Sequence, residues 1–409
     1  MSILPTANQS GKFAKRTCAV GAGIAGPERV KPRGAHMSNP RMAIVHERFT
    51  EVAGSEHVVE QFSKTWPEAI VHAPIARPSG VPSGLSSAPV TTWVDGAYRM
   101  LGHKSYAPLA PLLPRAFRGM DLGAVDAVVV SHHAFATQVA FATDAPVIAY
   151  VHSPARWAWD STFRAQEAGG LAGAAVLSAL SRIARRGELA AVDQLDQIVA
   201  NSTAVADRIM RWWGRESIVV HPPVDTGGFT PDFDVEREDF FLLAGRMVPY
   251  KRPDLAVRAA RRAGKRLVVV GDGRSMEACR DLAADDTAFL GRVPHDQLLD
   301  LYRRTRALLM PGVEDFGIVP VEAMACGAPV IALGEGGAID TVIPGSTGVL
   351  VTPGDDEAVV MGLAEAMSKF TARDLDSRAI RKWAENFSRT NFGERMSGVV
   401  DGVLARRTA

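Results

Sequence analysis

Residues 307–333 read ALLMPGVEDFGIVPVEAMACGAPVIAL, and this stretch decides the fold class. Its two ends, 307–310 and 329–333, are short uncharged apolar runs, which is the pattern of strands buried on both faces of a sheet. Between them a loop leads to Gly317, near which we predict that a helix begins. A strand, a helix and a second strand in this order predict a parallel pair joined by a right-handed crossover.

The same alternation of short apolar runs and longer amphipathic segments continues on both sides of this stretch. Further strands are predicted at 240–245, 267–271, 288–291 and 349–351, and nearer the N-terminus at 42–46, 127–131, 147–151 and 197–200. Helices are predicted at 54–66, 134–142 and 204–213, in each gap of the second half, and at 374–406. Residues 74–125 are rich in Pro and Gly, so we expect long loops over the strand ends there. The pattern predicts an α/β protein with two wound parallel sheets.

The alternation restarts near residues 221–225, where the sequence His-Pro-Pro-Val-Asp stiffens the backbone between two patterned regions. Such a proline-rich break is typical of a domain junction. We therefore predict an N-terminal domain at 42–222 and a C-terminal domain at 223–385. Ligands of two such sheets bind at the carboxyl ends of the strands, so the expected site lies between the domains.

Residues 1–41 differ from the rest of the chain. They carry many Gly, Pro, Lys and Arg residues without an apolar period, and we expect a disordered tail there. Gly21, Gly23 and Gly26 match a dinucleotide-binding spacing, but no buried strand precedes them. We assign these glycines no function.

Length, charge and cysteine content exclude several classes of protein. The chain has 409 residues, which is enough for two domains, and its net charge of +1 gives no reason to expect nucleic-acid binding. Cys18, Cys279 and Cys326 lack metal-ligand spacing, and we interpret them as reduced thiols of a cytoplasmic protein. No uncharged apolar run reaches about 18 residues, so no membrane span is expected.

Two basic segments raise the possibility of a peripheral contact with the inner face of the plasma membrane. Arg99, Lys104, Arg115 and Arg118 lie near the exposed apolar candidates Leu109, Leu112 and Leu113, and Arg182, Arg185 and Arg186 follow an apolar helix. Basic amphipathic elements can dock on anionic lipid. An ordinary solvated face is the other interpretation, and the sequence leaves both open.

Glu314 and Glu322 place two carboxylates eight positions apart, one on the predicted loop and one inside the predicted helix. They therefore belong to separate sites. Gly317 lets the backbone approach a ligand, and free N–H groups at the helix start can hold an anion. Glu322 could accept both hydroxyls of a ribose. The alternative is that both acids are ordinary residues stabilised by the helix dipole.

A second charged segment, GRMVPYKR at 245–252, directly follows the first strand of the second domain. A glycine turn with two cations, Arg246 and Lys251, suits a diphosphate at a strand end. Arg can chelate phosphate bidentately, while Lys acts as a point charge. Solvated loop charges are the alternative, but the strand-end position favours binding.

These two segments together resemble the large family-four group of retaining glycosyltransferases, over roughly residue 42 to the C-terminus. The resemblance implies the GT-B fold, with two Rossmann-like domains whose parallel sheets face an interdomain cleft. It also implies that residues 386–409 form a helix that crosses back to the first domain. In the donor site that the resemblance implies, Gly245, Arg246 and Lys251 bind the diphosphate. Glu314 binds the sugar and Glu322 the ribose. The backbone N–H groups of Phe316, Gly317 and Ile318 bind sugar and phosphate.

Other segments agree with this resemblance. Gly54 and Ser55 match a glycine-rich loop that touches diphosphate or acceptor, although the family often has two adjacent glycines where this chain has Ala53-Gly54. The remaining implied contacts are His152 near the transferred sugar, Gly271 in a tight turn near the nucleotide, and Arg292 and Val293 beside the base. Asn201-Ser202 matches a strand-to-helix turn, where we expect helix capping.

The resemblance implies transfer with retention, in which the cations stabilise the leaving nucleotide and the leaving phosphate takes the acceptor's proton. Neither a cofactor nor a metal is required, and we interpret Asp232-Phe233-Asp234 as a surface linker feature. The HSPARWAWD segment at 152–160 looks like one of bacterial mannosyltransferases. It favours GDP-mannose as donor and a glycan or lipid-linked glycan as acceptor, with a UDP-sugar as the alternative.

Four other functions are weighed against this one. Sugar-nucleotide epimerases share the architecture but lack the pairing of Arg246 and Lys251 with Glu314 and Glu322. A phosphorylase would need a lysine-bound pyridoxal phosphate, for which no motif is present. A nucleotide-sugar sensor without turnover stays open. A glycosidase would use flanking carboxylates but would have no purpose for a cationic phosphate loop.

Overall fold

The computed structural model describes residues 40–161, 164, 171–371 and 375–408, all of them in a compact unit that begins at Pro40. The predicted tail and its glycine motif lie almost entirely outside the described residues. No helix in the described part of the chain is both long enough and apolar enough to cross a membrane.

The described residues before 220 form a seven-stranded sheet in the order β3-β2-β1-β4-β5-β6-β7, with parallel pairing between neighbours. Its strands are β1 Met42–His46, β2 Ile70–Ala73, β3 Val90–Thr91, β4 Ala127–His132, β5 Val147–Val151, β6 Gln197–Ala200 and β7 Ile218–Val219. The strand order reverses between β1 and β4, which pair in register from Met42 with Ala127 to His46 with Ser131.

The described residues after 240 form a six-stranded parallel sheet in the order β10-β9-β8-β11-β12-β13. Its strands are β8 Phe241–Ala244, β9 Leu267–Val270, β10 Ala288–Gly291, β11 Ala307–Met310, β12 Val330–Leu333 and β13 Gly348–Val351. Here the order reverses between β8 and β11. The prediction of two wound parallel sheets is confirmed.

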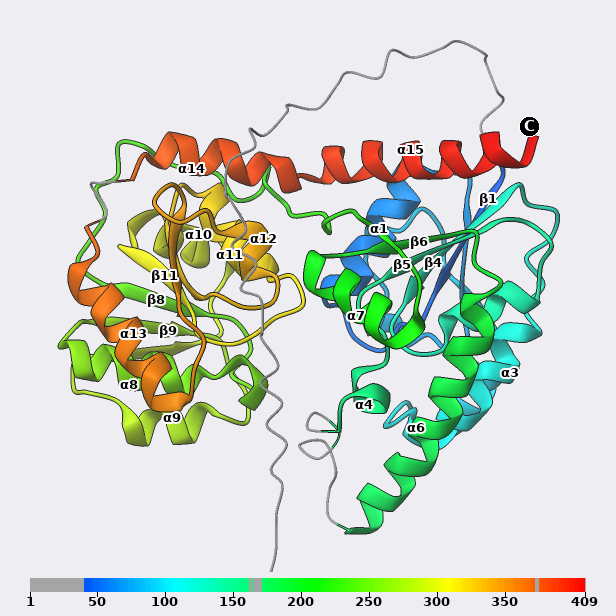
Figure 1. Cartoon of the computed structure of the whole chain (residues 1–409), viewed down its shortest axis with the longest axis horizontal. Helices are drawn as coiled ribbons and strands as arrows, with labels where there is room; N and C mark the ends of the chain where they lie inside the picture. The colour runs from blue at the N-terminus through cyan, green and yellow to red at the C-terminus, as the bar shows by residue number, and fades with distance from the viewer. Residues whose placement is uncertain (1–39, 162–163, 165–170, 372–374, 409) are drawn as a thin grey trace, which may run out of the picture. The chain divides into compact units, whose positions relative to one another are not determined.

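Helices fill the connections between the strands (Figure 1). The α-helices are α1 Gly54–Thr65, α2 Trp93–Met100, α3 Leu113–Arg118, α4 Arg156–Trp159, α6 Leu171–Val192, α7 Thr203–Trp213, α8 Pro253–Ala263, α9 Met276–Leu282, α10 His295–Arg304, α11 Ile318–Ala325, α12 Ala338–Thr341, α13 Asp356–Lys369, α14 Ser377–Ala384 and α15 Arg389–Thr408. The 3₁₀ helices are η1 Pro78–Gly80, η2 Ala107–Leu112, η3 Ala136–Phe141, η4 Pro249–Lys251 and η6 Glu385–Phe387.

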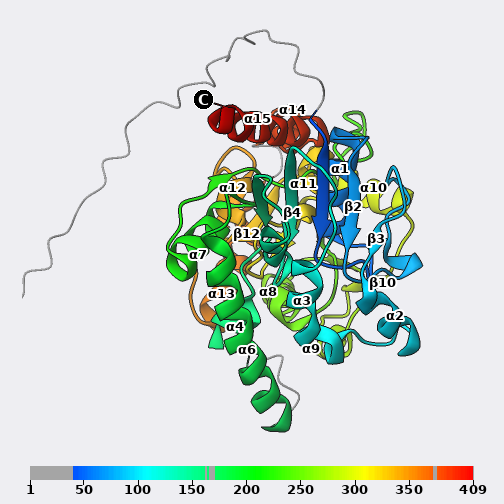
Figure 2. The same cartoon turned by 90° about the vertical axis from the view of Figure 1, so that its right-hand side faces the viewer.

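Alternate residues of each strand enter different apolar cores, as expected for sheets covered on both faces. In β1, Met42 and Ile44 pack with α1 and α15, whereas Ala43 and Val45 pack with α2, α3, η3, α6 and α7. Figure 2 shows α1 and α15 on one side of this sheet and α3 and α6 on the other. In the second half, α8, α9 and α13 cover one face, and α10, α11, α12 and α14 cover the other.

Helix α15 packs against α1 of the first half. Phe392 of α15 contacts Phe62 at a ring-centroid distance of 5.4 Å and Tyr150 at 5.5 Å. The preceding segment is tied to the second half, because Ile380 and Ala384 of α14 lie in the core that contains α11. The chain after α14 therefore connects the cores of both halves.

The region between residues 74 and 125 is more regular than the sequence indicates. It contains β3, α2, η2 and α3. Sequence analysis missed the edge strands β3 and β7, which have two residues each, and also the interior strand β2. Segment 134–142, predicted as an α-helix, forms the 3₁₀ helix η3. Leu109 and Leu113, expected to be exposed, are buried against Tyr98 and Phe117, so that prediction is wrong. The turns of η2 and α3 direct these leucines inward and leave Leu112 partly exposed.

Candidate functional site

The reversals of strand order place loops from both sheets at their carboxyl ends, where ligands of wound sheets bind. In the first half, the loop to Gly54 follows β1, Ser131 lies near the end of β4, and His152 follows β5. In the second half, the loop 245–251 follows β8 and the loop with Glu314 follows β11.

One cavity of about 600 Å³ brings most of the predicted site residues together. From the first half it is lined by Gly54, Ser55 and His152, and from the second by Gly245, Arg246, Lys251, Glu314, Phe316, Gly317 and Ile318. A Cβ atom added to Gly54 would lie 3.0 Å from Ile318 Cδ1, so the glycine loop and the start of α11 meet closely. Sequence analysis did not select Arg156, Asn201, Tyr250 and Asp315, which also line this cavity.

Lys251 and Glu314 form an ion pair inside this cavity. Lys251 Nζ donates to Glu314 Oε1 at 2.7 Å, and both side chains keep partial exposure, at 17% and 20%. The exposed Arg246 donates from Nη2 to Tyr250 Oη at 3.1 Å. The two predicted diphosphate ligands therefore lie on one loop, with Lys251 already beside the predicted sugar ligand.

Glycines fix the backbone of the cationic loop. Gly245 has a φ of +129°, a conformation that side chains with a Cβ rarely adopt. A Cβ atom at Gly271 would lie 1.8 Å from the Gly245 carbonyl oxygen. Gly271 therefore packs against the backbone of this loop, and it does not line the cavity.

A glycine cluster that sequence analysis missed supports the loop of Glu314. The Gly337 N–H donates to the Glu314 carbonyl oxygen at 2.9 Å, and a Cβ at Gly337 would lie 2.2 Å from the Phe316 carbonyl oxygen. Gly336 approaches the Glu314 backbone in the same way. The sequence does mark this cluster, because Gly-Glu-Gly-Gly at 334–337 directly follows the strand that ends at Leu333.

Asp315 connects the same loop to the first half. Its carboxylate pairs with the guanidinium of Arg208 on α7 and lies 3.5 Å from Arg156 Nη1. Nearby, the N–H of Thr203 donates to Asp340 Oδ2 at 2.8 Å. Ser202 accepts from the N–H of Val205 and caps α7, as predicted.

Besides Gly271, three predicted donor ligands do not line the cavity. Glu322 is within α11, where Tyr302 Oη donates to its Oε2 at 3.3 Å, and burial raises the pKa of Glu322 to about 7 against the effect of that hydrogen bond. Arg292 is exposed and Val293 half-buried at the start of the loop after β10. Their contacts to ribose and base stay predictions.

His152 lies at the first-half wall of the cavity. Its Nε2 lies 2.8 Å from Ser131 Oγ, and its ring stacks on His133 with centroids 4.5 Å apart. Burial of the ring, followed by the nearby His46, lowers the pKa of His152 to about 3. The imidazole is therefore neutral at physiological pH.

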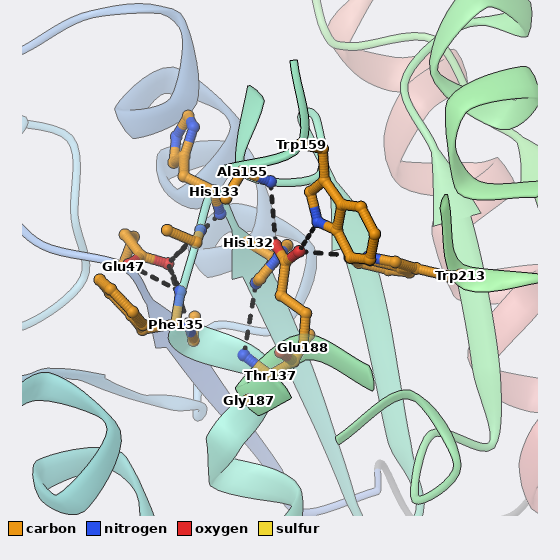
Figure 3. A network of polar contacts seen from close by, with 12 residues as sticks. Glu47, His132, His133, Phe135, Thr137, Ala155, Trp159, Gly187, Glu188 and Trp213 are labelled. Atoms are coloured by element: carbon orange, nitrogen blue, oxygen red, sulfur yellow. Dashed lines mark hydrogen bonds and ion pairs between the residues drawn. The ribbon is translucent and has the colours of Figure 1, made fainter. Parts of the chain in front are cut away.

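Two buried carboxylates, Glu47 and Glu188, hold the backbone after β4 and at Ala155 (Figure 3). Glu47 accepts from the backbone N–H groups of residues 133–136 at 3.0–3.3 Å. Glu188 accepts from the Ala155 N–H at 2.9 Å and from the indole N–H groups of Trp159 and Trp213, and it lies 3.2 Å from His132 Nε2. These contacts fix the turn after β4 and the segment after His152. Sequence analysis missed both acids because their partners are distant in sequence.

Asp232 and Asp234 are exposed, and the Asp234 N–H donates to Asp232 Oδ1 at 3.1 Å in a local turn. Within the described ranges, no group of three or more His, Cys, Asp or Glu residues is arranged to hold a metal ion.

Two family models match the two halves of the chain. The model described as Glycosyltransferase Family 4 matches residues 52–227, and the model described as Glycosyl transferases group 1 matches residues 232–383. The two halves of the chain are therefore similar to these two glycosyltransferase families.

Relatives of this chain include proteins named D-inositol 3-phosphate glycosyltransferase. The one from Mycobacteroides abscessus is 36% identical over 189 residues, which is 40% of this chain and 43% of the relative. The one from Acidothermus cellulolyticus is 31% identical over 259 residues, which is 54% of this chain and 57% of the relative. The chain thus spans about half the length of these relatives.

Solved structures share the fold. Sucrose-phosphate synthase from Thermosynechococcus elongatus has a TM-score of 0.70 at 18% identity, covering 90% of this chain and all of that one. Anabaena HepE, solved in complex with UDP, has a TM-score of 0.64 at 17% identity, covering 88% of this chain and all of that one. Together with the two family models, this likeness confirms the predicted GT-B fold.

Proposed function

We propose that this chain is a retaining glycosyltransferase that moves a hexose from a nucleotide-sugar to an acceptor hydroxyl. The observation that carries the proposal is the cavity in which Lys251, Glu314 and the start of α11 face Gly54 and His152. Cations and free helix N–H groups suit a diphosphate, whereas the acid suits the hydroxyls of a sugar.

The ion pair between Lys251 and Glu314 supports a specific order of events. Without a ligand, each group neutralises the other across 2.7 Å. A donor diphosphate would draw Lys251 toward its own negative charge and leave Glu314 free to accept from a sugar hydroxyl. Arg246, which is exposed and donates to Tyr250, would add a second cation to the diphosphate.

In the proposed transfer, Lys251, Arg246 and the N–H groups at the start of α11 stabilise the charge that develops on the leaving nucleotide. Well-placed donors of this kind are worth on the order of 3 kcal/mol each. The acceptor hydroxyl attacks the oxocarbenium-like sugar from the face that the nucleotide leaves, and its proton passes to the leaving phosphate. The neutral His152 adds no positive charge beside the sugar. We propose that neither a metal nor a cofactor is required.

We propose GDP-mannose as the donor, because the segment 152–160 resembles that of bacterial mannosyltransferases, and a glycan or lipid-linked glycan as the acceptor. D-inositol 3-phosphate is a second candidate acceptor, since it stands in the names of relatives that are 31–36% identical. A UDP-sugar is the competing donor.

We also propose a cytoplasmic location with a peripheral contact at the inner face of the plasma membrane. Trp93, Met100 and Leu101 are exposed on and beside α2, close in sequence to Arg99 and Lys104. Apolar and basic side chains in one segment suit an anionic lipid surface. Sedimentation with anionic liposomes at low salt tests this contact, and protein that stays in the supernatant would contradict it.

A thermal-shift screen without added metal tests the donor. GDP, UDP, ADP and their common sugars are compared, and the proposal expects the largest stabilisation from GDP and GDP-mannose. Selective stabilisation by UDP-sugars would keep the site and overturn the donor. A folded protein that shifts with none of them would overturn the proposed function.

A further inference from the structure

A row of buried polar side chains connects His152 to the glycine loop. Ser131 Oγ lies 2.8 Å from His152 Nε2 and 3.0 Å from His46 Nδ1, and His46 Nε2 lies 3.2 Å from Glu56 Oε1. Glu56 Oε2 then accepts from the Ala53 N–H and from Ser55 Oγ, each at 2.9 Å. Both ends of the row, His152 and Ser55, line the cavity.

The fold itself assembles this row. His46 ends β1, its register partner Ser131 lies on β4, and His152 directly follows the next strand, β5. Glu56 belongs to the first turn of α1, which begins above the end of β1. His46 and Ser131 are fully buried and Glu56 is 5% exposed, so protein groups must satisfy these side chains.

We propose that Glu56, His46 and Ser131 are positioning residues that fix His152 as its Nε2–H tautomer and leave Nδ1 as a hydrogen-bond acceptor for a hydroxyl of the bound sugar. The tautomer is a property of the protein alone, whereas the role of Nδ1 rests on the proposed function.

The direction of the hydrogen bonds follows from donor and acceptor counts. Burial alone would raise the pKa of Glu56, but its hydrogen bonds with His46 and Ser55 lower it to about 2, so Glu56 is an ionised acceptor. His46 must therefore donate from Nε2. Ser131 is fully buried between the His46 and His152 rings, so its hydroxyl donates to one ring and accepts from the other. A His46 ring with a single N–H, which is already given to Glu56, leaves Nδ1 to accept from the Ser131 hydroxyl.

Counting donors and acceptors in the same way also fixes the hydrogen bonds of His152. Ser131 donates its only hydroxyl proton to His46, so its oxygen accepts from His152 Nε2–H. A neutral imidazole carries one N–H, and His152 is neutral because burial lowers its pKa to about 3. Nδ1 of His152 is then an acceptor.

An acceptor at this position suits the proposed reaction. Positive charge develops on the sugar during transfer, and a neutral acceptor on a sugar hydroxyl leaves the site free of a competing cation. The opposite tautomer would present an N–H donor and would reverse the orientation of that hydroxyl. Ser131 acts on the reaction only through His152.

The direct test is ¹⁵N NMR of histidine-labelled full-length protein, with the His152 signals assigned by their loss in His152→Gln. The wild-type protein is expected to show a pyridine-like Nδ1 and a pyrrole-like Nε2–H at His152. An Nδ1–H signal instead overturns the proposal. This measurement needs no nucleotide-sugar, so it stands or falls independently of the proposed function.

Two variants of Ser131 test whether the row of buried side chains fixes the tautomer of His152. Ser131→Ala should give His152 a mixture of tautomers, whereas Ser131→Thr, which keeps the hydroxyl, should retain the wild-type signals. Ser63→Ala is the matched control, because it removes a fully buried hydroxyl that bonds to Ser86 at 2.8 Å. An unchanged His152 spectrum in Ser131→Ala would overturn the positioning role of Ser131.

A kinetic measurement separates positioning from a structural role. Ser131→Ala should lower kcat about tenfold, as expected for the loss of one hydrogen bond, with little change in the KM for the donor. Ser131→Thr should restore most of the rate. Equal losses in Ser131→Ala and Ser63→Ala would indicate a structural role only. Absence of transfer by the wild type, with the expected tautomer present, would reject the proposed function and keep the tautomer assignment.

Discussion

The two sheets supply the cavity with side chains of opposite character. The second half contributes charges that are partly exposed and paired with each other, Lys251 with Glu314. The first half contributes the neutral His152, whose partners Ser131, His46 and Glu56 are buried. Exposed paired charges can exchange partners when a ligand arrives, whereas a buried row holds one arrangement. Under the proposed function, donor capture therefore belongs to the second half and sugar orientation to the first.

The largest expected effect comes from removing the cation of the second half. Lys251→Ala should lower kcat/KM for the donor about 10³-fold, because it deletes a proposed diphosphate ligand and leaves Glu314 without its partner. Steady-state kinetics measure the change. Lys369→Ala is the control, since it removes a lysine that pairs with Glu365 on an exposed helix and should leave kcat/KM unchanged. A similar loss in both variants would contradict the assignment.

Removal of the acid separates binding from transfer. Glu314→Gln should lower kcat about 10²-fold, while the affinity for the free nucleoside diphosphate stays equal or rises because Lys251 is released. Calorimetric titration and kinetics give the two quantities. Glu335→Gln removes an exposed acid of the neighbouring glycine cluster and serves as the control. Parallel losses of affinity and rate would show that the acid holds the diphosphate site together.

A pH effect on stability is expected from Glu322, whose pKa rises from 4.5 to about 7. The folded state holds this proton more tightly than the unfolded state, so stability is greatest below pH 4.5 and falls as pH rises toward 7. Glu322→Gln should therefore gain, relative to wild type, on the order of 2 kcal/mol between pH 5 and pH 8. Urea unfolding at both pH values measures this, and an equal difference at both would contradict burial of the acid.

The smallest effect tests the support of the first half. Glu47→Gln should lower the free energy of unfolding by about 1.5 kcal/mol, because a neutral amide accepts more weakly from the N–H groups of residues 133–136. Chemical denaturation compares it with Glu51→Gln, which changes an exposed acid. Identical unfolding midpoints would show that the loop needs no carboxylate.

The same contrast explains what the sequence could predict. The residues 245–251 and 314–318 are contiguous motifs, so their place in one cavity was predictable once the strands on either side were recognised. Ser131, His46 and Glu56 meet only because parallel pairing aligns strand ends that are far apart in the chain. No local pattern marks such residues. Likewise, Leu109 and Leu113 are buried by turns of η2 and α3 that the Pro-rich sequence conceals.

Hydrogen–deuterium exchange with and without a saturating nucleotide-sugar tests the central claim, that both halves hold one donor in the cavity. Donor binding should protect the amides at 245–251 and 316–318, together with those at 53–55 of the first half. Protection confined to another part of the chain, or none from a donor that turns over, would contradict it.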